Sequence, residues 1–362
     1  MKFLEVIGAW INHYFSNEEA IYLVVLLLVI FITLFTLGDV LAPVLTGLVV
    51  AFLLDGLTEK LVALKLPDLS AVIVTFALFV GVLFAVMLFV APLVWRQLQG
   101  LLVSLPDAMV RVREVTQELA DSFPELVTEQ QINTWLENVT GEIVALTGSF
   151  IEAFVTNVPS LVGVLIYVVL VPISVFFFLK DRHRLLEWFH LLLPDQRSLL
   201  SAVGAEMNVQ LANYVRGKFI EILIVGSVTF IALQILGLNY AALLGVLVGV
   251  SVLIPFIGAA VVTIPVFLVA VIQFGWSWDL TWVMVAYGII QALDGNVLVP
   301  LLFSEAVDLH PITIIVAVLA FGGLWGVWGV FFAIPLATLI KAIYNAWPRE
   351  LQELPVPERA AE

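Results

Sequence analysis

Several long apolar runs with almost no charge constrain the fold of this chain more than any other feature. The longest runs exceed the ~18 residues that mark a membrane-spanning helix. Of the 362 residues, 62% are hydrophobic and only 12% are charged. This composition overrules the two or three soluble domains that length alone would suggest. We therefore predict an all-α integral membrane protein that crosses the bilayer several times.

The apolar runs predict about eight transmembrane helices and one further apolar region. The helices are expected at residues 20–37, 40–57, 71–94, 158–179, 217–237, 240–255, 258–275 and 280–300, and the further region at residues 312–340. Short cytoplasmic loops carry an excess of Lys and Arg, which predicts how the helices are oriented.

Lys60 follows the second helix, six Lys and Arg lie within residues 180–218, and Lys341 follows the last region. The turns near Asp39 and Asn239 carry no Lys or Arg. The pattern places the N-terminus and the basic loops in the cytoplasm and the two turns outside.

The last apolar region must then return to the side it entered from, because Lys341 lies in the cytoplasm. We expect residues 312–340 to form a re-entrant hairpin that folds back near residues 321–329. The four glycines of that stretch can supply the bend. Irregular backbone at membrane depth is tolerated only where protein or a water-filled cavity covers it. One long, tilted and kinked helix remains the alternative.

The segments outside the membrane complete the expected organisation. The expected divisions are residues 1–95 for an amphipathic N-terminal helix and three spans, 96–157 for a helical, periplasmic insertion, 158–216 for the fourth span and a cytoplasmic surface helix, 217–345 for a transport core with broken helices, and 346–362 for a cytoplasmic tail. The apolar stripes of the insertion are expected to pack within the chain or against another subunit. Asp195 is the expected N-cap of the surface helix.

The sequence lacks the motifs of several other function classes. No GxxxxGK[ST] phosphate loop occurs, so we expect no ATPase activity, and HExxH and GxSxG are also absent. There is no cysteine, and the four histidines are scattered, so we expect neither a metal site nor a cofactor. A net charge of −14 argues against nucleic acid as a partner. We predict that the protein is not an enzyme.

A polar cluster that begins at Gln291 interrupts the apolar run of residues 280–300. Asp294 lies one turn later on the same helix face, and Gly295 and Asn296 follow it directly. A charge near the membrane centre costs ~2.5–3.5 kcal/mol, so such groups are usually paired or line a polar path. Burial disfavours the charged form of a carboxylate, which makes Asp294 a candidate proton or cation carrier. Alternatively, Asp294 and Asn296 cap a helix break or bond to a neighbouring helix.

Other polar and helix-breaking residues lie near Asp294 in the sequence or belong to the expected hinges. Glu305 and His310 fall in a cytoplasmic turn, where they belong to a solvated loop or form a gate. Glu221 is expected to reach the membrane interface and pair there. The expected hinge and broken-helix residues are Pro255, Gly258, Pro265, Gly295, Pro300, Gly322, Gly323, Gly326, Gly329 and Pro335. The "TIP" ending at Pro265 and the "AIP" ending at Pro335 would run in opposite directions, as in inverted-repeat transporters.

These residues resemble the autoinducer-2 exporter family, and the chain looks closest to its PerM-like permease branch. The C-terminal pattern of the family reads here as Asn296, Pro300, Leu309-His310-Pro311, Gly322-Gly323, Gly326, Gly329 and Pro335. Upstream, the segment "YVRGKFIEILIVG" also resembles the family. The resemblance implies a multi-pass protein of the bacterial inner membrane and a homo-oligomer, with a pentamer suggested. It also implies export of a small polar signalling molecule or sodium- or lithium-proton antiport.

We therefore expect a transporter in the lipid bilayer that moves a small solute or a monovalent cation, coupled to protons. Asp294 would be the coupling or binding carboxylate, with Gln291 and Asn296 as its polar neighbours. Two alternatives stay open. One is a passive oligomeric channel, and the other is a structural membrane protein that recruits partners through its extramembrane helices.

Overall fold

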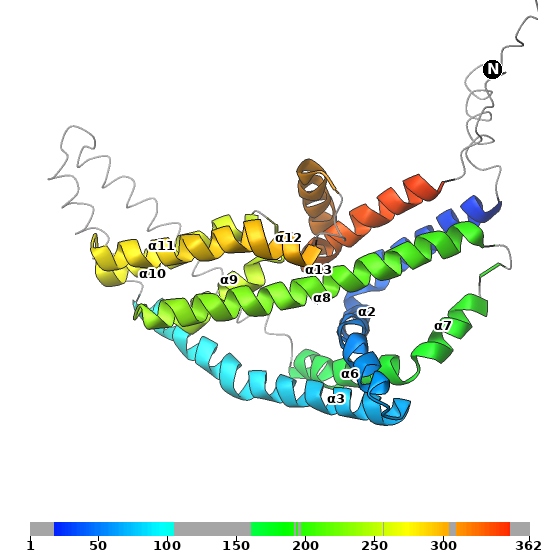
Figure 1. Ribbon diagram of the computed structural model, residues 1–362, viewed down its shortest axis with the longest axis horizontal. Coiled ribbons are helices and arrows are strands. Elements are labelled where there is room, and N and C mark those ends of the chain that lie inside the picture. The colour runs from blue at the N-terminus through cyan, green and yellow to red at the C-terminus, as the bar shows by residue number, and fades with distance from the viewer. Residues whose placement is uncertain are drawn as a thin grey trace, which may run out of the picture. The chain divides into compact units, whose positions relative to one another are not determined.

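The computed structural model describes residues 18–104, 161–191, 193–194, 197–255, 257–303 and 309–347 (Figure 1). These residues form helices and connecting turns, with no strand among them. Seven helices in this part of the chain are long and apolar enough to cross a membrane, and one shorter apolar helix accompanies them. The prediction of an all-α integral membrane protein is confirmed. Glu305 and most of the expected insertion and tail lie outside the described residues.

The chain divides into two compact units. Unit 1 comprises residues 1–42, 182–211 and 309–362, and unit 2 comprises residues 43–181 and 212–308. Two long helices, α2 (Glu18–Ala63) and α8 (Ser198–Ile235), contribute one part to each unit.

α2 is one continuous helix of 46 residues with Pro43 inside it. The turn that the sequence predicts near Asp39 is therefore wrong, and the first two expected spans belong to one element. Its 46 residues are more than twice the ~20 that one crossing of the bilayer needs. Gly38, the helix breaker of the expected turn, costs only ~1 kcal/mol relative to alanine inside a helix. That is too little to end a helix between two strongly apolar runs.

In unit 1, the start of α8 packs against the start of α2 and the end of α13 (Pro311–Ala346). The buried residues are Ala20, Leu23, Leu199, Leu200 and Val203, and Leu339 and Ile343 of α13 pack against them. Glu19 of α2 caps α8, because its carboxylate accepts hydrogen bonds from Leu199 N at 2.7 Å and from Ser198 Oγ at 3.1 Å.

The surface helix expected after the break at Pro194, over residues 195–216, is part of a longer helix. α7 (Arg182–Leu191) is a separate short helix, and α8 runs from Ser198 without a break into the expected fifth span. The apolar face expected on the membrane surface lies in part in the unit 1 core described above. Asp195, the expected N-cap, lies outside the described residues.

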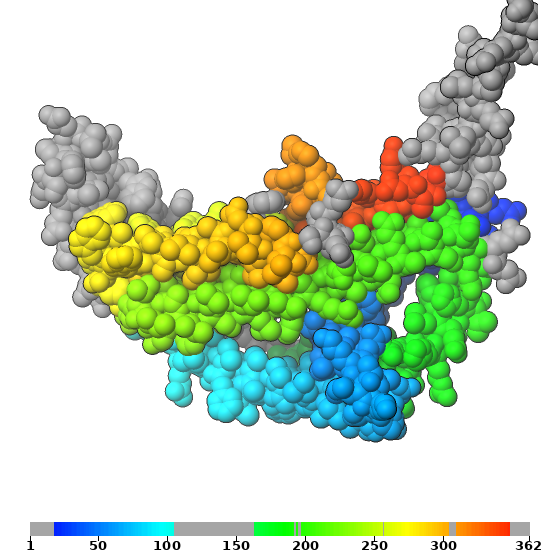
Figure 2. Space-filling view, in the orientation of Figure 1, coloured from blue at the N-terminus to red at the C-terminus, as the bar shows by residue number. Residues whose placement is uncertain are grey.

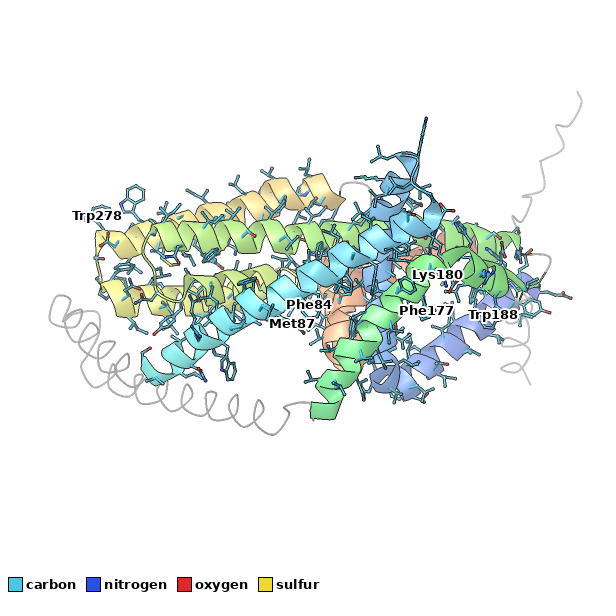
Figure 3. The ribbon with its side chains drawn as sticks, turned by 90° about the horizontal axis from the view of Figure 1, so that it is seen from below. Phe84, Met87, Phe177, Lys180, Trp188 and Trp278 are labelled. Atoms are coloured by element: carbon cyan, nitrogen blue, oxygen red, sulfur yellow. The ribbon has the colours of Figure 1, made fainter. Side chains whose placement is uncertain are left out.

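In unit 2, the C-terminal part of α2 packs with α3 (Asp68–Ala85) and α6 (Leu161–Lys180). Their buried apolar residues are Ala51, Val72, Val175 and Leu179, and Thr58 bonds to Thr75 at 3.2 Å between the buried hydroxyls. α3 continues through a π-helical turn, η1 (Val86–Val90), as far as Ser104. Phe84 and Met87 on this helix and Phe177 on α6 are exposed apolar side chains (Figure 3), as lipid-facing residues are.

α9 (Ala241–Ser251) and α10 (Ile257–Phe274) form a helical hairpin in unit 2. Gln273 of α10 ties the residues just before α9 to the end of α10, because it accepts from Asn239 N and donates to Gly237 O, both at 2.7 Å. With 11 residues, α9 rises ~17 Å, about half of the ~30 Å hydrocarbon core. The crossing expected at residues 240–255 is therefore a half-helix that ends at a break.

Glycines bring α9 close to α8. A Cβ atom added at Gly249 would lie 2.9 Å from Ile222 O, and one added at Gly245 would lie 2.9 Å from Gly226 O. The G-x-x-x-G spacing of Gly245 and Gly249 allows this approach of two backbones. α10 and α11 (Trp278–Leu293) lie along the same part of α8 (Figure 2), around a core that includes Val225, Val266 and Val283.

α11 begins among exposed tryptophans. Trp276, Trp278 and Trp282 are all more than half exposed, and Trp278 points outward (Figure 3). Tryptophan is enriched at membrane–water interfaces, so this end of α11 suits an interface. The helix continues through a π-helical turn, η2 (Asp294–Leu298), into α12 (Val299–Phe303).

α13 consists of two helical arms joined by a sharp bend. Trp325 (φ −129°, ψ 15°) and Gly326 (φ 58°, ψ −134°) leave the helical conformation. A Cβ atom at Gly329 would lie 1.8 Å from Phe321 O. In a straight helix, residues eight positions apart are separated by ~12 Å. The chain therefore folds back within residues 321–329, as predicted, and is not one long tilted helix.

Candidate functional site

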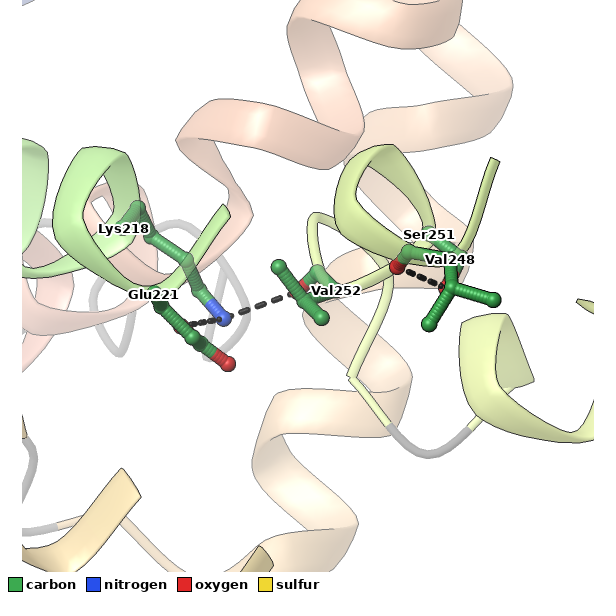
Figure 4. Close-up of polar contacts among 5 residues, drawn as sticks. All are labelled: Lys218, Glu221, Val248, Ser251 and Val252. Atoms are coloured by element: carbon green, nitrogen blue, oxygen red, sulfur yellow. Dashed lines mark hydrogen bonds and ion pairs between the residues drawn. The ribbon is translucent and has the colours of Figure 1, made fainter. Parts of the chain in front are cut away.

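A buried ion pair lies on the unit 2 part of α8. The Lys218 Nζ atom is 2.8 Å from Glu221 Oε2, and the two side chains are only 5% and 2% exposed. The same ammonium donates a hydrogen bond of 2.8 Å to Val252 O, just beyond the end of α9 (Figure 4). Lys218 thus joins a carboxylate on its own helix to the backbone of a helix break.

Pro255 explains why Val252 O is available to the lysine. The C-terminal carbonyls of a helix lack intrahelical partners, and a tightening turn would pair Val252 O with the N–H three residues on. That residue is Pro255, which has no N–H to donate. The chain then reverses tightly, because Gly258 N donates to Ile254 O at 2.9 Å. A proline predicted as a helix breaker therefore leaves a carbonyl free for an ammonium.

An aromatic ring covers the lysine from α12. The Lys218 ammonium lies 5.2 Å from the centre of the Phe303 ring, within the range of a cation–π interaction. Gly217 makes room for this ring, since a Cβ atom there would lie 2.7 Å from Phe303 Cε1. Tyr214, which is buried, packs on the same ring with 6.0 Å between ring centres. The ammonium is enclosed by a carboxylate, a carbonyl and a π-face.

Asp294 is buried at the first position of η2, and its Oδ1 atom has no hydrogen-bond partner within the described part of the chain. The charge of Lys218 acts on this carboxylate, and the Asp294 carboxylate acts in turn on Glu221. Lys218, Glu221 and Asp294 therefore form one electrostatic cluster. The cluster contains one ammonium and two carboxylates, so its net charge is −1 when all three groups are ionised.

The π-helical turn at Asp294 accompanies a proline. In an α-helix, the ring of Pro300 would clash with the carbonyl of Asn296, four residues earlier. The chain widens here instead, with Val299 N donating to Asp294 O five residues back. The unwinding expected at Gly295 is therefore a π-helical turn. η1 lies at the same spacing before Pro92, and turns of this kind occur frequently at functional sites.

The other predicted site residues do not gather around Asp294. Gln291 donates to the Tyr287 hydroxyl at 3.0 Å. Asn296 is exposed and donates to Ala292 O of its own helix at 2.8 Å. His310 caps α13, where its Nδ1 atom accepts from Ile312 N at 3.3 Å. Of the predicted transport residues that the structure describes, which are Gln291, Asp294, Asn296 and His310, Asp294 alone is in the cluster.

Gln291 belongs to a second polar chain inside unit 2. The Tyr287 hydroxyl lies 3.1 Å from Thr263 Oγ1 on α10, and Thr263 donates to Ala259 O at 2.7 Å. Tyr287, Gln291 and Asp294 follow each other at helix spacing on α11 and η2. Polar groups therefore continue from Asp294 along α11 within an otherwise apolar region.

The predicted hinge residues differ in what the structure requires of them. A Cβ atom at Gly258 would meet Ser251 O at 1.8 Å, Gly326 has a positive φ, and a Cβ atom at Gly322 would lie 2.8 Å from Val330 Cγ2. Gly295 and Gly323 have open space around them. Pro265 and Pro335 lie inside α10 and α13, which continue through them.

Sequence reasoning missed the position of Lys218 and the role of Val252. Glu221 does pair, but with Lys218 inside the protein, so the expected exposure at the membrane interface is wrong. The i,i+3 spacing of Lys218 and Glu221 was a signal for the pair. The Gly245–Gly249 spacing was a signal for the close approach of α9. No sequence pattern indicates a hydrogen bond from Lys218 to Val252 O.

The chain is similar to transport proteins over nearly its whole length. Residues 20–349 match the family described as AI-2E family transporter. PerM of Escherichia coli (strain K12), named as a permease, is 43% identical over 345 residues, which cover 95% of this chain and 98% of PerM. YueF of Bacillus subtilis (strain 168), named as a transport protein, is 27% identical over 297 residues, which cover 79% of this chain and 78% of YueF. The buried cluster lies within the matched residues.

Proposed function

The chain belongs to the AI-2E family of transporters, and we propose that it is a secondary transporter of the bacterial inner membrane. In this proposal it moves a small solute or a monovalent cation in exchange for protons, without an ATPase of its own. Asp294 is the coupling carboxylate, and the Lys218–Glu221 pair is its electrostatic partner.

One observation carries the proposal: the buried Asp294 carboxylate, whose Oδ1 atom has no hydrogen-bond partner among the described residues, lies in the field of a buried ion pair. Ionisable groups at membrane depth are expensive and are usually functional. One proton or one monovalent cation would neutralise the net charge of −1 on the cluster. Binding either ion would therefore change how readily the cluster is enclosed by apolar surroundings, which is what coupling requires.

Broken helices support the same proposal. Transporter sites commonly lie at discontinuous helices whose ends face the bound ion. The α9–α10 hairpin and the α13 bend each contain a glycine whose Cβ atom would meet a backbone oxygen, at Gly258 and Gly329. A proline follows each glycine within seven residues, at Pro265 and Pro335. The recurrence supports an internal repeat of hairpins as the moving parts.

The test is proton movement in sealed proteoliposomes that contain a pH-sensitive dye. Pulses of sodium or lithium are applied to wild-type protein and to Asp294→Asn. We expect a cation-dependent proton signal in the wild type and its loss in the variant, because an amide cannot carry the proton. Asp279→Asn is the matched control, since Asp279 is an exposed aspartate on the same helix and should leave the signal unchanged.

Three other outcomes count against the proposal. An equal signal in wild type and Asp294→Asn would remove Asp294 from the mechanism. Flux without a proton signal, faster than carrier turnover, would favour a passive channel. The absence of a signal in all proteins would contradict cation–proton exchange and turn the search to small organic solutes.

A further inference from the structure

The surroundings of the Lys218 ammonium are those of a cation-binding site. Glu221 Oε2 and Val252 O each lie 2.8 Å from Nζ, and the Phe303 ring faces it at 5.2 Å. These groups come from three separate stretches of chain, namely α8, the end of α9 and α12 (Figure 4 shows the first two). A carboxylate, a carbonyl and a π-face all favour positive charge.

The end of α9 adds to this preference. The C-terminus of a helix carries a partial negative charge from its unpaired carbonyls. In transporters with discontinuous helices, such carbonyls and helix C-termini coordinate sodium or protons. Here the break after α9 presents Val252 O to a side-chain ammonium. Lysine suits exchange better than arginine does, because it is a compact charge on a flexible stem with rotatable donors.

Stability alone does not explain the buried pair. Replacing a buried ion pair by apolar residues of similar volume is often neutral or stabilising, so such a pair needs another reason to be present. Asp294 supplies one, because it is a second buried carboxylate in the field of Lys218 and its Oδ1 atom has no hydrogen-bond partner in the part of the chain that the structure describes. If the Lys218 ammonium left Glu221, the Asp294 carboxylate would be a second group of opposite charge for it.

We propose that Lys218 is a tethered occupant of a monovalent-cation site formed by Glu221, Val252 O and the Phe303 ring. A free cation enters this site when the ammonium leaves it. The inference deepens the proposed function by naming a second ion position and the group that competes for it. The ligand class is a small monovalent cation, either an alkali metal ion or ammonium.

The test removes the tethered cation and supplies free ones. Purified Lys218→Ala is heated in ammonium, potassium, sodium, lithium or choline chloride at equal ionic strength, and the unfolding temperature is recorded. Binding to the folded state raises this temperature, so at least one small cation should raise it by roughly 2–4 °C over choline. Wild type and Lys60→Ala, which changes an exposed lysine on α2, should show no such difference.

The double variant Lys218→Ala/Glu221→Gln separates a site from a general salt effect. It removes the carboxylate of the site and should lose the cation-dependent shift. The same shift in single and double variants, or no shift in the single variant, would overturn the proposal. If Lys218→Ala unfolds during purification, Lys218→Met keeps the apolar stem and takes its place. Recovery of that folded variant only in small-cation salts would support the site, and equal loss in all salts would overturn it.

This measurement is independent of transport. A cation-dependent shift in Lys218→Ala together with normal proton movement in Asp294→Asn would keep the cation site and refute the coupling role of Asp294. Loss of proton movement in Asp294→Asn with no shift in Lys218→Ala would keep the coupling role of Asp294 and refute the cation site.

Discussion

Replacing Gly258 by alanine tests whether the α9–α10 turn is as tight as the structure has it. The added Cβ atom would lie 1.8 Å from Ser251 O and 2.7 Å from Ser251 C. Real Cβ contacts essentially never fall below 3.0 Å, so the two backbones must separate by at least 1.2 Å, which is 3.0 minus 1.8. The clash is with backbone rather than with the end of a flexible side chain, so a change of rotamer cannot relieve it.

The expected loss of stability follows from that geometry. Over-packing costs ~1–3 kcal/mol where neighbours can adjust. Here the neighbour belongs to a turn closed by hydrogen bonds from Gly258 N to Ile254 O and from Ile257 N to Pro255 O, at 2.9 and 2.7 Å. We expect a loss of ~3 kcal/mol, at the upper end of that range. Val252 directly follows Ser251, so its contact with Lys218 should also be disturbed.

Gly288→Ala is the matched control. Gly288 lies within α11, and a Cβ atom there would meet nothing within 4 Å. Alanine is better than glycine in a helix by ~0.5–1 kcal/mol, so this variant should be slightly more stable than wild type. Unfolding in detergent, followed by tryptophan fluorescence, measures both variants. Equal stability of Gly258→Ala and Gly288→Ala would refute the close approach of α9 and α10.

Two further predictions follow from the buried pair and the α13 bend. Glu221→Gln should destabilise the protein by ~3–5 kcal/mol because it leaves the Lys218 charge buried without a full partner, whereas Lys218→Met/Glu221→Gln should recover most of that loss in the same unfolding assay. A double variant as unstable as the single one would contradict this. Gly326→Ala should cost ~1–3 kcal/mol, since its φ of 58° and ψ of −134° are rarely adopted by other residues, while Gly323→Ala, with open space around it, should not destabilise. An equal effect of the two alanines on unfolding would argue against the bend.

The sequence predicted the fold class and several breaks because these depend on strong local effects. Apolar runs longer than the bilayer is thick have few other places to fold. Proline removes a donor wherever it stands, and Val252 O does lie beside a break at Pro255. The positive φ at Gly326 also falls inside the predicted bend.

Weaker local preferences did not decide the structure. Gly38 and Asp39 resemble a turn, yet α2 continues through them. Leu199, Leu200 and Val203 lie on the apolar face of a helix expected on the membrane surface, yet they are buried against α2. The first difference arises because one glycine costs a helix too little to end it. The second arises because the sequence shows which face of a helix is apolar but not what covers that face.

The position of Lys218 could not be predicted for a different reason. Its hydrogen bond to Val252 O joins residues 34 positions apart and depends on how closely α9 approaches α8. That approach is set by Gly226, Gly245 and Gly249, which carry no charge themselves. The polar residues of the sequence therefore indicate Asp294, but they do not indicate the glycines that bring the Lys218 ammonium to Val252 O.

The helix break after α9 and the charge cluster are connected through Lys218. Pro255 frees Val252 O, the free carbonyl binds Lys218, and the charge of Lys218 acts on Asp294. A change in the charge of Asp294 or Glu221 must therefore alter how strongly the Lys218 ammonium is held at Val252 O, in the turn between α9 and α10. Conversely, a movement of that hairpin must alter the electrostatic energy of both carboxylates. This reciprocity is what linkage requires of the ion-coupled transporter that we propose, because a bound ion can shift a conformational equilibrium only by its difference in affinity for the two states.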